Sequence, residues 1–426
     1  MTLATLSLEQ APPITVPFRF FLSAPLFLLL AAAAWLLTDS SALSSRWSPA
    51  VLGITHLLTL GFMAMVMCGA MLQLLPVLAG APVPNPRVMA WAIHMPLLGG
   101  TLLLAGGLYF SLTPALMPGA VLLALALVTF LLAAFFSLLR APARNASTRA
   151  MMLALLALAL TLSLGLLLVA GVGGWLGVPL LELATLHVAW GLLGWTMMLL
   201  IGVAYQVVPM FQLTPPYPGW ATRWLGGSLF ASLLLWSLAQ LAAWPRALEL
   251  AAGLLVALCL ATFALLTLQL QRQRRRRVAD ITLQFWQAGL GSLLLAVALW
   301  LAAQANDTLA HSNAFALALG MLLIVGLALS VIMGMLYKIV PFLIWFHLQG
   351  NAPGKRVPHM KEIIRDADAR WHLRAHLLGL PLFLLSAVWP WPWKYAAGGV
   401  LLLSGALLLR NMLRAWRLYL TTLQAG

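Results

Sequence analysis

Two histidines lie inside long hydrophobic segments at nearly matched distances from a proline. His56 precedes Pro76 by 20 residues, and His187 precedes Pro209 by 22 residues. An ionisable side chain inside a membrane segment is costly, and such residues commonly mark functional sites. Neutral imidazole is a good ligand for iron, copper or zinc. Both histidines are therefore candidate ligands of a metal or a metal-containing cofactor, with interhelical hydrogen bonding as the alternative for each.

The two prolines belong to a motif that the chain contains three times. It reads GAMLQLLP at 69–76, GVAYQVVP at 202–209 and GMLYKIVP at 334–341. In each copy a glycine lies seven residues before the proline and another lies fifteen before it, at Gly69 and Gly61, Gly202 and Gly194, and Gly334 and Gly326. Small residues let membrane helices approach closely. Generic packing would explain the glycines but not three matched registers, so we infer an internal repeat.

The composition predicts that the helices carrying these motifs cross a membrane. The chain has 426 residues, of which 63% are hydrophobic and 8% charged, whereas soluble proteins carry about 25% charged residues. Apolar stretches long enough to cross a bilayer as helices occur at 19–38, 50–78, 88–111, 116–139, 150–172, 180–211, 224–243, 248–270, 281–304, 312–347, 372–390 and 394–413. The prediction is an all-α polytopic membrane protein with twelve transmembrane helices.

The motif divides these spans into three units of four, at 1–142, 148–272 and 280–421. It lies in the second helix of each unit, in spans two, six and ten. With an even number of spans per unit, all three copies run in the same direction through the membrane. The sequence therefore predicts three parallel four-helix repeats in a single transmembrane domain, unlike inverted-repeat transporters.

The positive charge predicts the topology rather than a nucleic-acid partner. The net charge of +15 is gathered in alternate connections, including the run QRQRRRR at 271–277 and the 350–374 loop. This asymmetry follows the positive-inside rule and places both termini in the cytoplasm; an anionic-lipid site is the alternative for the arginine run. The residues before Arg19 lack the basic start and apolar core of a cleaved signal peptide.

Twelve spans, three four-helix arcs and histidines at the outer ends of spans two and six resemble the heme-copper oxidase subunit I superfamily. The segments HVAWGLLGW…GVAYQVVP and GMLYKIVP are similar in register to span ten of its C-type branch. The NnrS family of membrane heme proteins, linked to nitric oxide stress, is an equally good comparison. Either resemblance implies a bacterial inner (cytoplasmic) membrane.

The resemblance assigns roles to three residues. His56 matches an axial ligand of the low-spin heme, and His187 matches a copper-ligating histidine. Leu319 and Met321 occupy the positions of two span-ten histidines that this chain lacks, and span seven has no histidine pair. The usual oxygen-reducing centre is therefore not expected. Met321, at the position of the second low-spin ligand, could complete a His/Met-ligated b-type heme or simply fill the core.

For most of the remaining polar residues we prefer a structural role to a functional one. Glu182 could orient His187, but an interfacial charge is preferred, and Lys338 is expected to reach the membrane surface. We expect His94 to be packed and hydrogen-bonded. We expect His359, His372 and His376 to lie in a solvated or headgroup-facing amphipathic stretch, although the last two have the spacing of metal ligands on one helix face. Cys68 and Cys259 are expected as buried thiols.

The favoured hypothesis is a heme-copper oxidase-like protein that binds heme b, with copper as a further option. It would serve electron transfer, nitric oxide handling or a respiratory complex, with respiratory-chain or cytochrome partners, a lipid bilayer around it and no nucleic acid. A membrane transporter or delivery protein for copper, heme or another small solute is the alternative, and a scaffold without a cofactor is the third hypothesis. The sequence does not indicate the oligomeric state.

Overall fold

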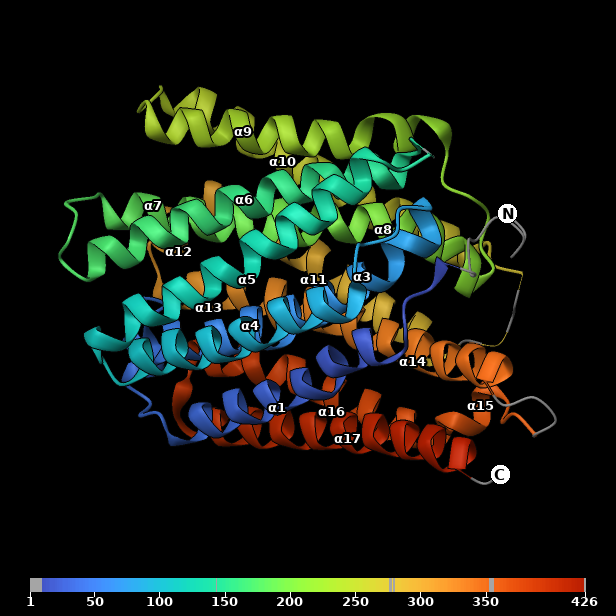
Figure 1. The fold of residues 1–426 in the computed structure, drawn as a ribbon. Helices are drawn as coiled ribbons and strands as arrows, with labels where there is room; N and C mark the ends of the chain where they lie inside the picture. Colours follow the sequence, from blue (N-terminus) through green and yellow to red (C-terminus); the bar gives the residue numbers. More distant parts are fainter. Residues whose placement is uncertain (1–9, 143, 276–277, 279, 352–355, 425–426) are drawn as a thin grey trace. The chain divides into compact units, whose positions relative to one another are not determined.

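The computed structural model describes residues 10–142, 144–275, 278, 280–351 and 356–424. The N-terminal residues 1–9 and two members of the arginine run, Arg276 and Arg277, lie outside the described residues. Within the described part, twelve helices are long and apolar enough to cross a membrane, and long helices dominate the ribbon (Figure 1). The expected all-helical membrane fold with twelve spans is confirmed.

The first six spans include α1, α4, α5 and α6 as single helices, whereas spans two and six are each built from three consecutive segments. The elements are α1 (Thr15–Leu37), η3 (Ala42–Ser44), α2 (Pro49–His56), η4 (Leu57–Ala64), α3 (Met65–Ala79), α4 (Pro86–Tyr109), α5 (Thr113–Leu139), α6 (Ala146–Val172), α7 (Leu180–Ala189), η5 (Trp190–Thr196) and α8 (Met197–Gln212).

The last six spans follow the same scheme, and span ten is again built from three segments. The elements are η6 (Ala221–Leu225), α9 (Gly226–Leu241), α10 (Arg246–Arg272), α11 (Ile281–Gln304), α12 (Asp307–Ala310), α13 (Asn313–Met321), η7 (Leu322–Leu329), α14 (Ser330–Asn351), α15 (Met360–Ile363), α16 (Asp366–Val388) and α17 (Pro390–Gln424). Span eleven begins at Asp366, six residues before the start expected from hydropathy. Hydropathy misses the first turns of this helix because they contain charged residues.

Contacts divide the chain into two compact units. Unit 1 holds Met71–Gly107 and Leu112–Val278, together with the chain before Pro13. Unit 2 holds Pro13–Ala70, Leu108–Ser111 and Ala279–Gly426. The boundaries do not follow the predicted repeats, because unit 2 combines spans one and most of two with spans nine to twelve. Within unit 2, α1 packs against η4 and α17, and α16 packs against α17.

The three motif helices share an unusual local geometry. Each changes from α-helix to π-helix, and the π segments are η4, η5 and η7. Leu57, Trp190 and Leu322 begin these segments, and each lies 19 residues before the proline of its motif. A π segment is rare and is frequently found at functional sites; a further π segment, η6, lies in span seven, outside the motif helices. The recurrence of η4, η5 and η7 at one register supports the repeat that the motif predicts.

Close packing between the first and second helix of each repeat also recurs. A Cβ added at Gly69, Gly202 or Gly334 would lie 2.6, 2.9 or 2.6 Å from the Cβ atom of Phe20, Ala150 or Phe285, respectively. The glycines fifteen residues before the prolines behave alike: a Cβ at Gly61, Gly194 or Gly326 would meet Phe27, Ala157 or Ser292. On the first helix of each pair the two contact positions are seven residues apart, nearly two full turns, whereas the two glycines of the second helix are eight residues apart. Three helix pairs therefore meet through the same two positions.

The structure also explains why the third motif has lysine where the others have glutamine. Lys338 Nζ lies 2.7 Å from the Oδ2 atom of Asp280. The other carboxylate oxygen of Asp280 accepts the Leu283 N–H and so caps α11. At the equivalent start of α6, the neutral side chain of Asn145 provides the cap. Lysine at 338 thus accompanies a charged cap, whereas glutamine at 206 accompanies a neutral one.

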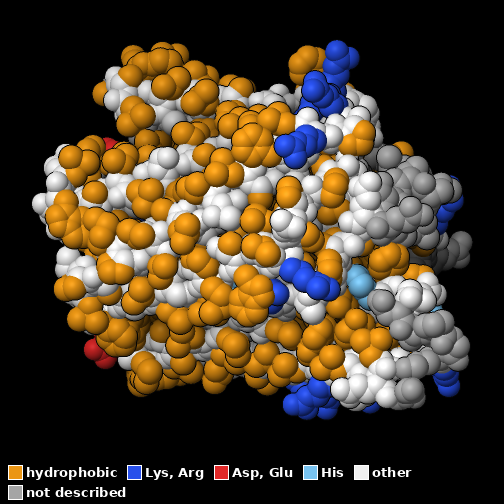
Figure 2. All heavy atoms as spheres, in the orientation of Figure 1, with side chains coloured by type: hydrophobic (Ala, Val, Ile, Leu, Met, Phe, Trp, Pro, Cys, Tyr) orange, Lys and Arg blue, Asp and Glu red, His pale blue; other side chains and the backbone are white. Residues whose placement is uncertain are grey.

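The outer surface is that of a protein surrounded by lipid. Many Leu, Val, Phe and Trp side chains are more than half exposed, including Leu37, Leu125 and Leu258. Hydrophobic side chains cover most of the visible face (Figure 2). A bilayer accommodates such a surface, whereas water would not.

The shared glycine contact can be tested in unit 2. Because a Cβ at position 334 would lie 2.6 Å from Phe285 Cβ, we expect Gly334→Ala to lower the free energy of unfolding by about 1–3 kcal/mol through overpacking. Gly291→Ala in α11 is the control, since nothing lies within 4 Å of its added Cβ, and it should leave stability unchanged or slightly raised. Thermal unfolding in detergent measures both, and equal melting temperatures for the two variants would contradict the packing argument.

Candidate functional site

His56 is the last residue of α2 and directly precedes η4. Its Nδ1 atom lies 2.8 Å from the carbonyl oxygen of Leu52, one turn earlier. A carbonyl can only accept a hydrogen bond, so Nδ1 carries the proton. The lone pair is then on Nε2, which is the form of imidazole that ligates a metal, with the other nitrogen held by a backbone carbonyl.

His187 lies in α7, two residues before that helix ends. Its Nδ1 atom donates across to the carbonyl oxygen of Thr161 on α6, at 3.0 Å. The ring packs so closely on α6 that a Cβ at Gly165 would lie 3.1 Å from His187 Cε1. Glu182 is exposed, so a backbone carbonyl rather than this carboxylate orients the imidazole. Again the lone pair is on Nε2.

The tautomer alone does not distinguish these two residues. His311 and His347 also donate from Nδ1 to the carbonyl four residues earlier, at 2.7 and 2.9 Å. His56 and His187 differ from these two residues in their position. His56 directly precedes a π segment that starts at the repeated register, and His187 lies three residues before another. The position, rather than the hydrogen bond, marks them as candidates.

Met321 has the same place in span ten that His56 has in span two. It is the last residue of α13 and directly precedes η7, and η7 packs against η4. Unit 2 contains both residues, whereas His187 belongs to unit 1. Among the described residues, no three His, Cys, Asp or Glu side chains come together as a metal site.

The structure corrects the interpretation of His372 and His376. They were expected in a solvated or headgroup-facing stretch, but they are 0% and 2% exposed. The segment is amphipathic as expected, since Arg370 and Arg374 are exposed. The histidines follow these arginines by two residues, which is about 200° around a helix. They therefore lie on the opposite, buried face of α16.

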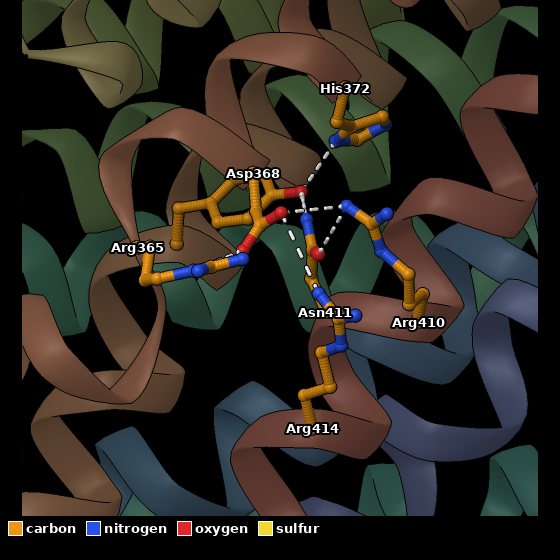
Figure 3. A network of polar contacts seen from close by, with 7 residues as sticks. Arg365, Asp368, His372, Arg410, Asn411 and Arg414 are labelled. Carbon is orange, nitrogen blue, oxygen red and sulfur yellow. Dashed lines mark hydrogen bonds and ion pairs between the residues drawn. The ribbon is translucent and has the colours of Figure 1, made fainter.

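His372 belongs to a buried polar network formed by α14, α16 and α17 (Figure 3). Its Nδ1 atom lies 2.8 Å from the Tyr337 hydroxyl and its Nε2 atom 2.9 Å from the Ser404 hydroxyl. Asn411 Nδ2 donates to the Tyr337 oxygen at 3.0 Å, and Arg410 Nη2 lies 3.4 Å from Asn411 Oδ1. The network reaches Asp368, whose Oδ1 atom accepts from Arg410 Nη2 at 3.0 Å.

Arg410 sets the orientation of the Asn411 amide, and this favours one direction for the hydrogen bonds that follow. A guanidinium only donates, so the atom of Asn411 that faces it is the oxygen and the amide NH₂ faces Tyr337. The Tyr337 hydroxyl accepts from Asn411 and so donates its own proton to His372 Nδ1. His372 then carries its proton on Nε2 and donates to Ser404. Its tautomer is the reverse of that of His56, and both of its ring nitrogens are engaged, so His372 is not a ligand candidate.

His376 lies one turn further along α16. Its Nε2 atom lies 2.7 Å from the hydroxyl of Ser330, the first residue after η7. The ring of Phe285 lies against both imidazoles, with centroid distances of 5.4 Å to His372 and 5.5 Å to His376. The two histidines thus attach α16 to span ten at two levels.

The other sequence expectations have mixed outcomes. His94 is buried in α4, as expected. Both cysteines are buried free thiols, also as expected. His359 is exposed and caps α15 together with Glu362, which agrees with its expected solvated position. Lys338 pairs with Asp280, so its charge is balanced within the protein rather than only at the membrane surface.

The direction of the network makes a specific prediction. In Asn411→Asp the new carboxylate, held ionised by Arg410, can only accept. Tyr337 should then donate to it and accept from His372, which moves the His372 proton from Nε2 to Nδ1. Nitrogen-15 NMR of labelled histidine reports this exchange. Ser404→Ala is the control and should keep the proton on Nε2; an unchanged His372 signal in Asn411→Asp would refute the assigned direction.

Comparison with known proteins places the fold. No protein-family model matches the chain, and no curated protein matches it. A solved structure does, and it is that of a heme-copper terminal oxidase that forms a dimer. The match has a TM-score of 0.62 and 12% sequence identity, and it covers 97% of this chain and 84% of the other. The chain therefore has a heme-copper oxidase-like fold with twelve membrane-spanning helices.

Proposed function

We propose that this chain is a heme-copper oxidase-like membrane protein that binds a b-type heme through His56. It would act in electron transfer or nitric oxide handling, with respiratory-chain or cytochrome partners, in a bacterial cytoplasmic membrane. The observation that carries the proposal is the setting of His56, whose Nδ1–H is held by the Leu52 carbonyl directly before the repeated π segment. The solved oxidase supports it through the fold alone.

The donor set fits a heme better than a copper centre. A heme needs only one or two protein ligands, and unit 2 offers an imidazole at His56 and a thioether at Met321, each directly before one of two π segments in contact. Catalytic metal sites commonly use three protein ligands, and no such group of His, Cys, Asp and Glu exists in the described part of the chain. Met321 is the proposed second protein ligand and would hold the heme together with His56.

The protein's own residues would then prepare the ligand. The Leu52 carbonyl fixes the ring orientation of His56 and makes Nε2 more basic. Leu57, Leu58 and Phe62, all buried, exclude water from the segment that follows. A thioether ligand together with an imidazole ligand raises the reduction potential of a heme. A bound heme would supply a one-electron couple.

His187 is proposed as a separate ligand, for heme or copper. It belongs to unit 1 and has the same tautomer as His56, held by Thr161. Its register differs from that of His56 by two residues relative to the proline. A difference of two residues turns a side chain by about 200° on an α-helix, so the proposal does not place the two imidazoles on one metal.

An absorption spectrum of the purified protein tests the proposal. The wild type should show a Soret band that shifts on reduction, and His56→Ala should lose it because the imidazole ligand is gone. His347→Ala is the matched control, since it removes a half-buried imidazole with the same backbone hydrogen bond outside the repeated register, and it should keep the wild-type spectrum.

Other outcomes would contradict the proposal. If both His56→Ala and His187→Ala keep a wild-type heme spectrum, the ligand assignment is wrong. Stoichiometric copper without heme would favour a transport or delivery function. A folded protein that binds neither would favour a scaffold or a transporter of another solute.

A further inference from the structure

Unit 2 has a pocket where α15, the start of α16 and the last turns of α17 meet. Its volume is about 230 Å³, and Glu362, Ile363, Ile364, Arg365, Asp368, Asn411, Arg414 and Leu418 line it. The lining combines apolar residues with charged ones. The pocket lies outside the ligand candidates of spans two, six and ten.

Three guanidinium groups converge on a single carboxylate at this pocket. The Asp368 carboxylate is bound by Arg365 Nε at 2.8 Å, by Arg410 Nη2 at 3.0 Å and by Arg414 Nη1 at 3.6 Å, and the side chains surround it in the close-up view (Figure 3). Glu362, the other acidic residue of the lining, pairs with Arg356 at 3.6 Å. Arg365, Arg410 and Arg414 thus exceed the single charge of the Asp368 carboxylate by two, while Glu362 is balanced by Arg356.

The arginines retain donors for a further anion. Asp368 engages Arg365 through Nε, and a guanidinium has five N–H donors in a planar fork. The side chains of Arg365 and Arg414 are 69% and 53% exposed, so their remaining N–H groups can meet a molecule from outside. Two guanidiniums around one site match the oxygens of a phosphate group, which arginine binds bidentately.

The surroundings point to a lipid as the source of that phosphate. The pocket lies at the ends of spans eleven and twelve, where headgroups meet the protein, and Ile363, Ile364 and Leu418 give it an apolar wall. Trp371, one turn into α16, is 59% exposed, and tryptophan favours the membrane interface. By the charge asymmetry this end faces the cytoplasm, whose leaflet carries anionic lipids that basic pockets between membrane helices bind.

We propose that this pocket binds the phosphate group of an anionic phospholipid. Arg365 and Arg414 contact the phosphate, Arg410 holds Asp368 in place behind them, and the apolar wall contacts the acyl chains. Through Arg410 and Asn411 the bound lipid adjoins the network that sets the His372 tautomer. The site does not involve heme, so the test of lipid binding and the test of the proposed function are independent of each other.

The test is lipid binding to the purified full chain in a neutral detergent, measured by native mass spectrometry with phosphatidylglycerol and with phosphatidylcholine. The anionic lipid should bind more tightly. Arg365→Gln/Arg414→Gln should bind it roughly 30-fold more weakly, about fivefold for each guanidinium removed. Arg417→Gln is the control: it removes an exposed arginine one turn further along α17 that does not line the pocket, and its affinity should match the wild type.

The other outcomes of this experiment identify the source of the anion or contradict the proposal. Competition by millimolar inorganic phosphate would support the anion site but assign it to free phosphate. Three results would overturn the proposed lipid site. They are equal affinity for the two lipids, wild-type affinity in the double variant, or a loss of affinity in Arg417→Gln as large as that in the double variant. Should the double variant fail to fold, Arg414→Gln and Arg414→Lys replace it, since Arg365 and Arg410 still hold Asp368. The lysine variant should bind more tightly than the glutamine variant, and equal wild-type affinity in both would overturn the site.

Discussion

The fold depends on close approach between the first and second helix of each repeat. Two glycines, eight residues apart on the second helix, leave room for side chains of the first helix at the places where their own Cβ atoms would be. In a bilayer no hydrophobic force drives helices together, so packing of this kind must do so. The π segments begin at a fixed distance from the same motif, which places His56 and Met321 directly before their π segments and His187 three residues before its own.

The buried polar groups of unit 2 add a second constraint, which is directional. Hydrophobic packing leaves side chains free to exchange rotamers, whereas a network with one obligatory donor has a single consistent arrangement. Arg410 is that donor, and the chain of hydrogen bonds from it to Ser404 connects α14, α16 and α17. Lys338 and Asp280 tie span ten to span nine in the same unit. The unit that contains His56 and Met321 thus has its helices fixed by polar contacts as well as by apolar ones.

His56 and His187 have the opposite tautomer to His372, although all three are buried or half-buried in membrane helices. His56 and His187 donate from Nδ1 to a backbone carbonyl and carry the lone pair on Nε2. His372 donates from Nε2 and accepts at Nδ1 from a tyrosine hydroxyl. The difference arises from the neighbour, since a carbonyl only accepts, whereas the Tyr337 hydroxyl already accepts from Asn411 and has its proton available for His372. A ligand role therefore suits the first pair, and a structural role suits His372.

The sequence alone was enough to predict twelve membrane helices, because a bilayer requires long apolar segments whatever the fold. It also predicted the repeated register, since Gly61, Gly194 and Gly326 can be aligned without coordinates. In the sequence, His372 and His376 each follow an arginine, Arg370 or Arg374, by two residues, and this spacing places the histidines on the helix face opposite the arginines. The spacing therefore indicated two buried imidazoles, but hydropathy placed the start of span eleven six residues late. Only the tertiary structure decided the π segments, the partner of Lys338 and the tautomers of His56, His187 and His372. These depend on which atoms of distant segments meet, and neither composition nor spacing encodes that directly.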